Sequence, residues 1–263
     1  MQQKKSLGQN FLKNRAVVRA MITAAHIEST DVVLEAGPGK GILTEALLAT
    51  GAHVVAVEKD NRLIPLLREK FSTELVSGKL VLAEGDILSF PTERYTLHAT
   101  RYKLVANIPY YITGAFLKKF LEDGPQPNTM ALLVQKEVAT RILARNGKES
   151  ILSISVKAFG TPKILRTVRA SEFSPVPKVD SAVLFIENIS KNFFADLDEK
   201  IFFKILKAGF AHKRKLLAGN LSVLFPKEKI AAAFETCGIP EKSRAEDIIK
   251  EQWFALTKQL NRA

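Results

Sequence analysis

Short apolar, β-branched runs alternate with segments of helical spacing, and this alternation constrains the fold more than any other feature of the sequence. The runs cover residues 32–35, 53–57, 79–83, 103–106 and 130–134. Helices are predicted at residues 42–48, 62–71, 115–121 and 136–143, and two more strands at residues 162–168 and 179–187. This order predicts βαβ units and a mainly parallel sheet that is covered on both faces.

The alternation ends near residue 190, and the remainder of the 263-residue chain shows only helical spacing. Apolar side chains recur every three or four residues from Phe202 to Phe210, and further helical segments follow. We therefore predict an α/β catalytic domain over residues 1–189 and a small all-helical domain over residues 190–263. Residues 1–30 of the first domain are expected to form a basic arm and a helix.

Two capping patterns place helix starts within these domains. Asn14 precedes an apolar helical pattern that runs to about His26, and its side chain can cap the first turn. Ser243-x-x-Glu246 has the spacing of a capping box, which predicts that the last helix opens there.

The formal net charge is +12, and most of the excess lies toward the two ends of the chain. Residues 190–263 carry 14 basic and nine acidic side chains, whereas residues 31–189 carry 20 basic and 17 acidic ones. Such an excess indicates a polyanionic partner, either a nucleic acid or an anionic membrane surface. A basic surface without a specific partner is the alternative.

The cysteine and histidine content argues against several kinds of chemistry. The single Cys237 permits no disulfide within the chain, and the four histidines are scattered without metal-ligand or triad spacing. No segment has the pattern of a signal peptide or a transmembrane helix. We expect a cytoplasmic protein that uses no metal and has no membrane partner.

A glycine-rich turn follows the first predicted strand, where an open α/β sheet binds ligands. The turn runs from Glu35 to Gly41, and its glycines allow the backbone to turn tightly and to approach a ligand. A dinucleotide fingerprint requires G-x-G-x-x-G, but the spacing here is Gly37-x-Gly39-x-Gly41. This shorter spacing favours a ligand that has no pyrophosphate.

Acidic residues close the next two strands and complete a predicted nucleoside site. Glu58 ends the second strand, where a carboxylate can accept hydrogen bonds from both ribose hydroxyls. Asp86 follows the third strand and can accept a hydrogen bond from an adenine amino group. A nucleoside site without a phosphate clamp suits S-adenosylmethionine, and a nicotinamide cofactor is the alternative that the glycine spacing disfavours.

The fourth strand ends in Asn107-Ile108-Pro109-Tyr110, a pattern suited to methylation of an amino group. The amino nitrogen of adenine is a weak nucleophile because its lone pair is delocalised into the ring. The Asn107 side-chain oxygen and a main-chain carbonyl can hold its protons, Pro109 can stiffen the turn, and Tyr110 can stack on a base that has left its helix. The alternative is a tight turn in which these residues serve only geometry.

A second rigid segment, Phe173-Ser174-Pro175-Val176-Pro177, connects the last two predicted strands. Phe173 has two interpretations of about equal weight. Its ring can form the other face of a clamp around the base, or it can fill the core.

Taken in order, the motifs closely resemble those of the ribosomal RNA adenine N6,N6-dimethyltransferases, and especially the small-subunit dimethyladenosine transferases. The resemblance runs almost from end to end of the chain. It rests on residues 7–12, 34–41, 57–60, 85–86, 107–111, 135–139, 173–181 and 210–215. Each motif alone is weak, but the set in this order is highly specific.

The resemblance implies roles for residues that composition does not reveal, such as Asn10 and Leu12 in the cofactor pocket. The full predicted S-adenosylmethionine site comprises Asn10, Leu12, Gly37, Gly39, Glu58, Asp86, Ile87 and Asn107. The predicted catalytic residues are Asn107, Pro109, Tyr110 and Phe173. Lys4, Lys5, Lys13, Lys213, Arg214 and Lys215 are predicted to contact RNA phosphates.

The implied activity is the transfer of four methyl groups to two adjacent adenines near the 3′ end of small-subunit (16S) rRNA, in an assembling ribosomal subunit. The helical C-terminal domain would contribute to RNA placement, and we expect a monomer with no obligate protein partner. Two alternatives are a large-subunit rRNA adenine methyltransferase of the antibiotic-resistance type and a non-catalytic assembly or transcription factor on the same fold. DNA adenine methylation is a weaker alternative, because no separate module that reads DNA sequence is visible.

Overall fold

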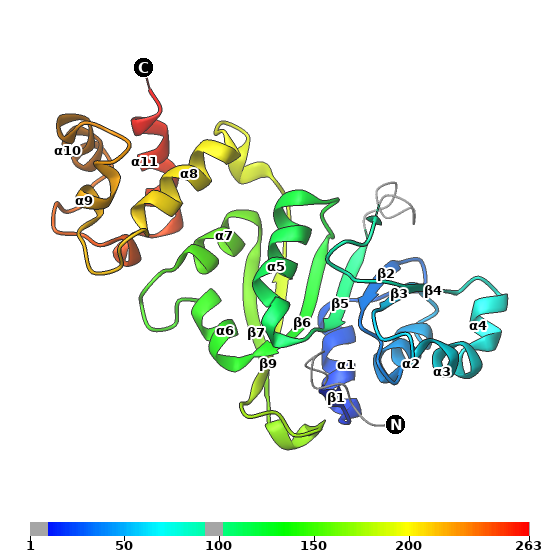
Figure 1. The fold of residues 1–263 in the computed structure, drawn as a ribbon. Helices are drawn as coiled ribbons and strands as arrows, with labels where there is room; N and C mark the ends of the chain where they lie inside the picture. The colour runs from blue at the N-terminus through cyan, green and yellow to red at the C-terminus, as the bar shows by residue number, and fades with distance from the viewer. Residues whose placement is uncertain (1–9, 93–101, 263) are drawn as a thin grey trace. The chain divides into compact units, whose positions relative to one another are not determined.

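A computed structural model of the protein describes residues 10–92 and 102–262, and its centre is a seven-stranded sheet. The strands are β2 (Val32–Ala36), β3 (His53–Glu58), β4 (Leu80–Glu84), β5 (Lys103–Asn107), β6 (Thr129–Gln135), β7 (Thr161–Val168) and β9 (Ser181–Glu187). Their order is β4-β3-β2-β5-β6-β9-β7 (Figure 1). The first five are parallel, and β9 is antiparallel to both of its neighbours. The predicted α/β class is confirmed.

Helices follow the parallel strands as the sequence predicts. They are α1 (Arg15–Ala24), α2 (Ile42–Leu48), α3 (Ile64–Lys70), α4 (Ser72–Val76), α5 (Thr113–Lys118) with a π-helical turn over Lys119–Asp123, and α6 (Lys136–Ile142). Side chains of α1, α2 and α3 share a core cluster with Val33 of β2, Val105 of β5 and Leu133 of β6. The Asn14 side-chain oxygen accepts a hydrogen bond from the Ala16 amide at 2.7 Å, so the predicted cap of α1 is confirmed.

The strand order brings the predicted site together. β3 and β4 lie on one side of β2, whereas β5 and β6 lie on the other, so the chain changes direction at β2. The loops after β2, β3, β4 and β5 therefore emerge at one carboxyl edge of the sheet, on both sides of this switch point.

The chain divides into two compact units, and their bounds differ from a single cut at residue 189. The first comprises residues 1–139 and 161–189, and the second comprises residues 140–160 and 190–263. Residues 140–160 fall within the first predicted domain. Their helix α7 (Ile151–Phe159) instead packs with the C-terminal helices, and the Phe159 ring lies 5.1 Å from that of Phe194.

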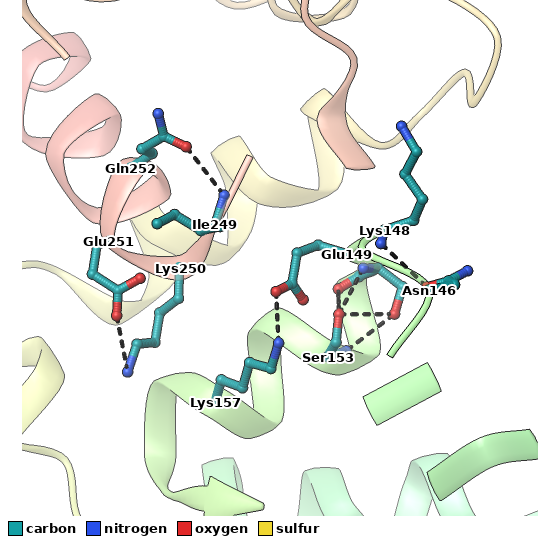
Figure 2. A network of polar contacts seen from close by, with 10 residues as sticks. Asn146, Lys148, Glu149, Ser153, Lys157, Ile249, Lys250, Glu251 and Gln252 are labelled. Carbon is teal, nitrogen blue, oxygen red and sulfur yellow. Dashed lines mark hydrogen bonds and ion pairs between the residues drawn. The ribbon is translucent and has the colours of Figure 1, made fainter. Parts of the chain in front are cut away.

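The second unit is helical, as predicted. Besides α7 it contains α8 (Glu199–Gly209), α9 (Leu217–Leu221), α10 (Lys227–Thr236) and α11 (Lys250–Leu260). Figure 2 shows the polar network around α7, in which Lys157 pairs with Glu149 at 2.6 Å. Ser150 and Ser153 form a capping box at the start of this helix. The Glu149 amide donates to the Glu246 carbonyl at 2.8 Å, which ties the start of α7 to the C-terminal segment.

The predicted start of the last helix is wrong. Glu246 lies in a separate 3₁₀ turn over Ala245–Asp247, and α11 begins only at Lys250. The turn is closed by Asp247, whose carboxylate accepts a hydrogen bond from the Arg244 amide at 2.8 Å, so the capping interaction is displaced by one residue from the predicted pair. Among the described residues, no helix has the length and apolar character that a membrane span requires.

Candidate active site at the carboxyl edge of the sheet

The glycine-rich turn after β2 has the conformation that its sequence predicts. Gly37, Gly39 and Gly41 all have positive φ angles, of 70°, 59° and 76°. At Gly39 a Cβ atom would lie 3.0 Å from the Phe11 ring, and at Gly41 it would lie 2.6 Å from the Phe71 ring. Both positions therefore require glycine for conformation and for space. The turn leaves its backbone open toward a cavity.

Glu58 braces this turn from the end of β3. One carboxylate oxygen accepts a hydrogen bond from the Gly39 amide at 2.9 Å, and the other accepts one from the Asp60 amide at 2.8 Å. Burial raises the pKa of Glu58, although these amide hydrogen bonds act in the opposite direction. The carboxylate is thus fixed in orientation at the cavity wall.

Asp86, after β4, carries an ion pair that the sequence analysis did not foresee. Its carboxylate accepts a hydrogen bond from the Lys59 ammonium at 2.7 Å and another from the Leu88 amide at 3.0 Å. The hydrogen bond from Lys59 lowers the pKa of Asp86, so the carboxylate is ionised and available as an acceptor. The Lys59–Asp86 pair lies across two adjacent strand ends.

Asn107 ends β5, and its amide group is held by a distant part of the chain. The side-chain nitrogen donates to the Asn10 carbonyl at 3.0 Å. This hydrogen bond fixes which way the amide points and leaves the side-chain oxygen as an acceptor. Tyr110, three residues later, is anchored as well, because its hydroxyl lies 2.6 Å from the hydroxyl of the buried Ser181. The predicted catalytic turn is therefore rigid.

One cavity of about 210 Å³ brings most of these groups together within the first compact unit. Its lining includes every predicted cofactor residue, namely Asn10, Leu12, Gly37, Gly39, Glu58, Asp86, Ile87 and Asn107. Pro109 and Tyr110 line the same cavity. The predicted cofactor and amine sites thus share one space.

Glu35 also lines the cavity, and the sequence analysis gave it no role. Its side chain is fully buried, and neither carboxylate oxygen has hydrogen-bond geometry with a described residue, although Thr44 lies close enough to act against the rise in its pKa. Burial raises its pKa to about 8. Its place at the end of a buried strand was a signal, because a carboxyl group in such a position either meets a ligand or remains protonated.

Phe173 does not line this cavity but packs behind its wall. Its ring is fully buried in the core cluster that also contains Leu12 and Met21, and the cavity lining does not include it. Phe173 and Ser174 form the short strand β8, which pairs with β1 (Phe11–Leu12). A buried ring offers no face to a base, so the structure supports core packing and we propose no catalytic role for Phe173.

The predicted RNA-contacting residues that the structure describes do not line the cavity. Lys13 is exposed after β1, and Lys213, Arg214 and Lys215 are exposed in the loop between α8 and α9. The buried Asn220 holds that loop, because its side-chain nitrogen donates to the carbonyls of Gly209 and His212. Lys4 and Lys5 lie outside the described residues.

The sheet order and the site at its carboxyl edge define a Rossmann-like methyltransferase fold, and comparisons with known proteins agree. Residues 1–262 match the family model described as ribosomal RNA adenine dimethylase. Ribosomal RNA small subunit methyltransferase A of Dehalococcoides mccartyi is 39% identical over 252 residues, which cover 95% of this chain and 86% of that protein. The ribosomal RNA small subunit methyltransferase A of Fusobacterium nucleatum is 37% identical. The match covers 97% of this chain and 96% of that protein.

Solved structures give the same answer. A dimethyladenosine transferase from Plasmodium falciparum matches with a TM-score of 0.80 and 27% identity, covering 94% of this chain and 95% of that one. The 23S rRNA methyltransferase ErmE matches with a TM-score of 0.76 and 27% identity, covering 96% of this chain and 100% of that one. The chain belongs to the ribosomal RNA adenine dimethylase family, which confirms the resemblance seen in its motifs.

Proposed function

We propose that this protein transfers methyl groups from S-adenosylmethionine to N6 of two adjacent adenines near the 3′ end of small-subunit (16S) rRNA, and that it acts on an assembling subunit. The observation that carries the proposal is a cavity that joins the glycine turn and its acidic neighbours to Asn107, Pro109 and Tyr110. Relatives named ribosomal RNA small subunit methyltransferase A are 36–39% identical over nearly the whole chain, which favours the small-subunit substrate.

The cavity suits a nucleoside with a charged tail. Glu58 and Asp86 offer carboxylate acceptors, Gly39 keeps the turn open, and neither oxygen of Glu35 has hydrogen-bond geometry with a described residue. Glu58 and Asp86 would hold the ribose and the adenine of S-adenosylmethionine, and the glycine turn and Asn10 would hold its remainder. When bound, the cofactor supplies a methyl group already activated on a sulfonium sulfur.

Asn107 and its turn prepare the target amine. The Asn107 oxygen and a carbonyl of Ile108 or Pro109 accept hydrogen bonds from the two N6 protons, which favours a pyramidal nitrogen whose lone pair faces the methyl group. With the cofactor bound, the amine held in this way would accept the methyl group that the sulfonium supplies, and one N6 proton would then pass to water. Tyr110 stacks on the base. Because Asn10 and Ser181 fix these side chains in advance, most of the catalysis is positioning.

Methyl transfer from labelled S-adenosylmethionine tests this proposal directly. Immature small subunits, large subunits and duplex DNA are offered separately, and the modified nucleosides are identified by mass spectrometry. We expect dimethyladenosine in small-subunit RNA alone. Label in large-subunit RNA would assign the protein to the other branch, and tight small-subunit binding without any label would favour a non-catalytic assembly factor.

The basic loop of the second unit should contribute to RNA affinity through charge. We expect the triple substitution Lys213→Gln, Arg214→Gln and Lys215→Gln to make the salt dependence shallower, reducing the slope of log K against log salt by about 2, because each phosphate contact contributes roughly 0.7 on single-stranded RNA. Filter binding across a salt series measures the slope. Lys227→Gln and Lys229→Gln in α10 are the matched control, and an unchanged slope for the triple variant would remove these residues from the RNA site.

A further inference from the structure

Residues 10–14, here called the N-terminal strap, contribute their first three residues to one wall of the cavity. Asn10 and Leu12 line it, and the Phe11 ring lies against the glycine turn, 3.0 Å from the position of a Cβ atom on Gly39. The Lys40 ammonium lies over the same ring, 5.2 Å from its centroid. The strap therefore contacts both the turn that would bind the cofactor and, through the Asn10 carbonyl, the Asn107 amide.

Glu172 fastens the other end of this strap. Its carboxylate accepts a hydrogen bond from the Asn14 side-chain nitrogen at 2.5 Å, and its main-chain carbonyl accepts one from the Lys13 amide at 2.9 Å. The other carboxylate oxygen accepts a hydrogen bond from the Arg169 amide at 3.1 Å, which closes the 3₁₀ turn Ala170–Glu172. One half-buried side chain thus ties the strap to the segment that precedes β8.

We propose that Glu172 is a positioning residue for methyl transfer: through Asn14 it holds the strap against the cavity, so that Phe11 closes the cofactor site and Asn10 orients Asn107. The inference rests on the proposed function. Glu172 lines no part of the cavity, so its effect is transmitted entirely through the strap. Loss of the fastening therefore weakens cofactor binding and lowers kcat together.

The Asn14–Glu172 pair allows a test by exchange of donor and acceptor. Asn14→Asp keeps the helix cap, since Asp and Asn cap equally well, but it sets two carboxylates against each other. Adding Glu172→Gln restores a hydrogen bond in the opposite sense, because the Gln amide donates to Asp while its oxygen still accepts from the Arg169 amide.

We expect Asn14→Asp to weaken S-adenosylhomocysteine binding, measured by calorimetry, and kcat/KM for the cofactor by about tenfold or more, the scale of one charged hydrogen bond. The double variant should return to within about threefold of wild type, and Glu172→Gln alone should fall between them. Melting temperatures verify that each variant is folded. The control is Glu187→Gln, the same change in an exposed ion pair with Lys163 on β7.

The two proposals fail in different ways. Unchanged cofactor affinity and kcat/KM in Asn14→Asp, or a double variant no better than Asn14→Asp, would overturn the role of Glu172. Wild-type protein that binds S-adenosylhomocysteine but methylates no RNA would refute the proposed function, while the binding series would still decide whether the strap is fastened by this pair.

Discussion

Asn107→Ala should lower kcat for methyl transfer to small-subunit RNA by about 10²–10³-fold, the effect of removing one preorganised polar group at a reacting centre. The substitution removes the oxygen that accepts an N6 proton and the nitrogen that donates to the Asn10 carbonyl at 3.0 Å. Single-turnover kinetics with saturating cofactor and RNA separate this chemical step from binding.

Affinity for RNA serves as the internal control for this variant, because Asn107 lies in the cavity and not on the basic loop. It should change by less than about threefold in filter binding. Asn261→Ala, at an exposed position after α11, is the matched substitution and should leave kcat unchanged. Full activity in Asn107→Ala would mean that the turn serves only backbone geometry.

Glu35→Gln should stabilise the protein by about 4 kcal/mol at pH 8, which corresponds to a rise in melting temperature of roughly 10 °C. In the folded chain, burial raises the pKa of Glu35 from 4.5 to about 8. Between these values the unfolded state is ionised while the folded state holds its proton, so wild-type stability falls as pH rises. Glutamine has the shape of the protonated acid and carries no such penalty.

The difference in stability between Glu35→Gln and wild type should grow from near zero below pH 4.5 to its full size at pH 8. Thermal unfolding of both proteins across this pH range measures it. Glu84→Gln, an exposed carboxylate at the end of β4, is the control and should show no such trend. Equal melting temperatures of Glu35→Gln and wild type at pH 8 would show that a partner satisfies the buried carboxylate.

The sheet and the strand-end residues could be predicted because local sequence determines them. Parallel strands buried on both faces appear as continuous apolar runs, and β2 to β6 each end within a few residues of the predicted bounds. Since such strands end at one edge of a sheet, residues as distant as Gly37, Glu58, Asp86 and Asn107 could be expected to meet, and the cavity brings them together.

Tertiary packing determines what the sequence could not reveal. Residues 140–160 join the C-terminal helices because Phe159 packs with Phe194 and the Glu149 amide binds Glu246, contacts that no local pattern encodes. Tertiary packing also decides between the two interpretations of Phe173, a base clamp or core packing, because they differ only in which way its ring points. The Asn10–Asn107 hydrogen bond joins residues 97 positions apart, so spacing alone could not predict it.

The pairing of β1 with β8 also affects how the chain matures on the ribosome. The strap precedes Phe173 and Ser174, its partners in β8, by about 160 residues. At about 5–20 residues per second, the strap waits roughly 10–30 s for these partners. During that interval the glycine turn and both acidic residues are synthesised, but the strap has no β8 partner. We therefore expect this wall of the cavity to be completed only after strands β2 to β7 have been made.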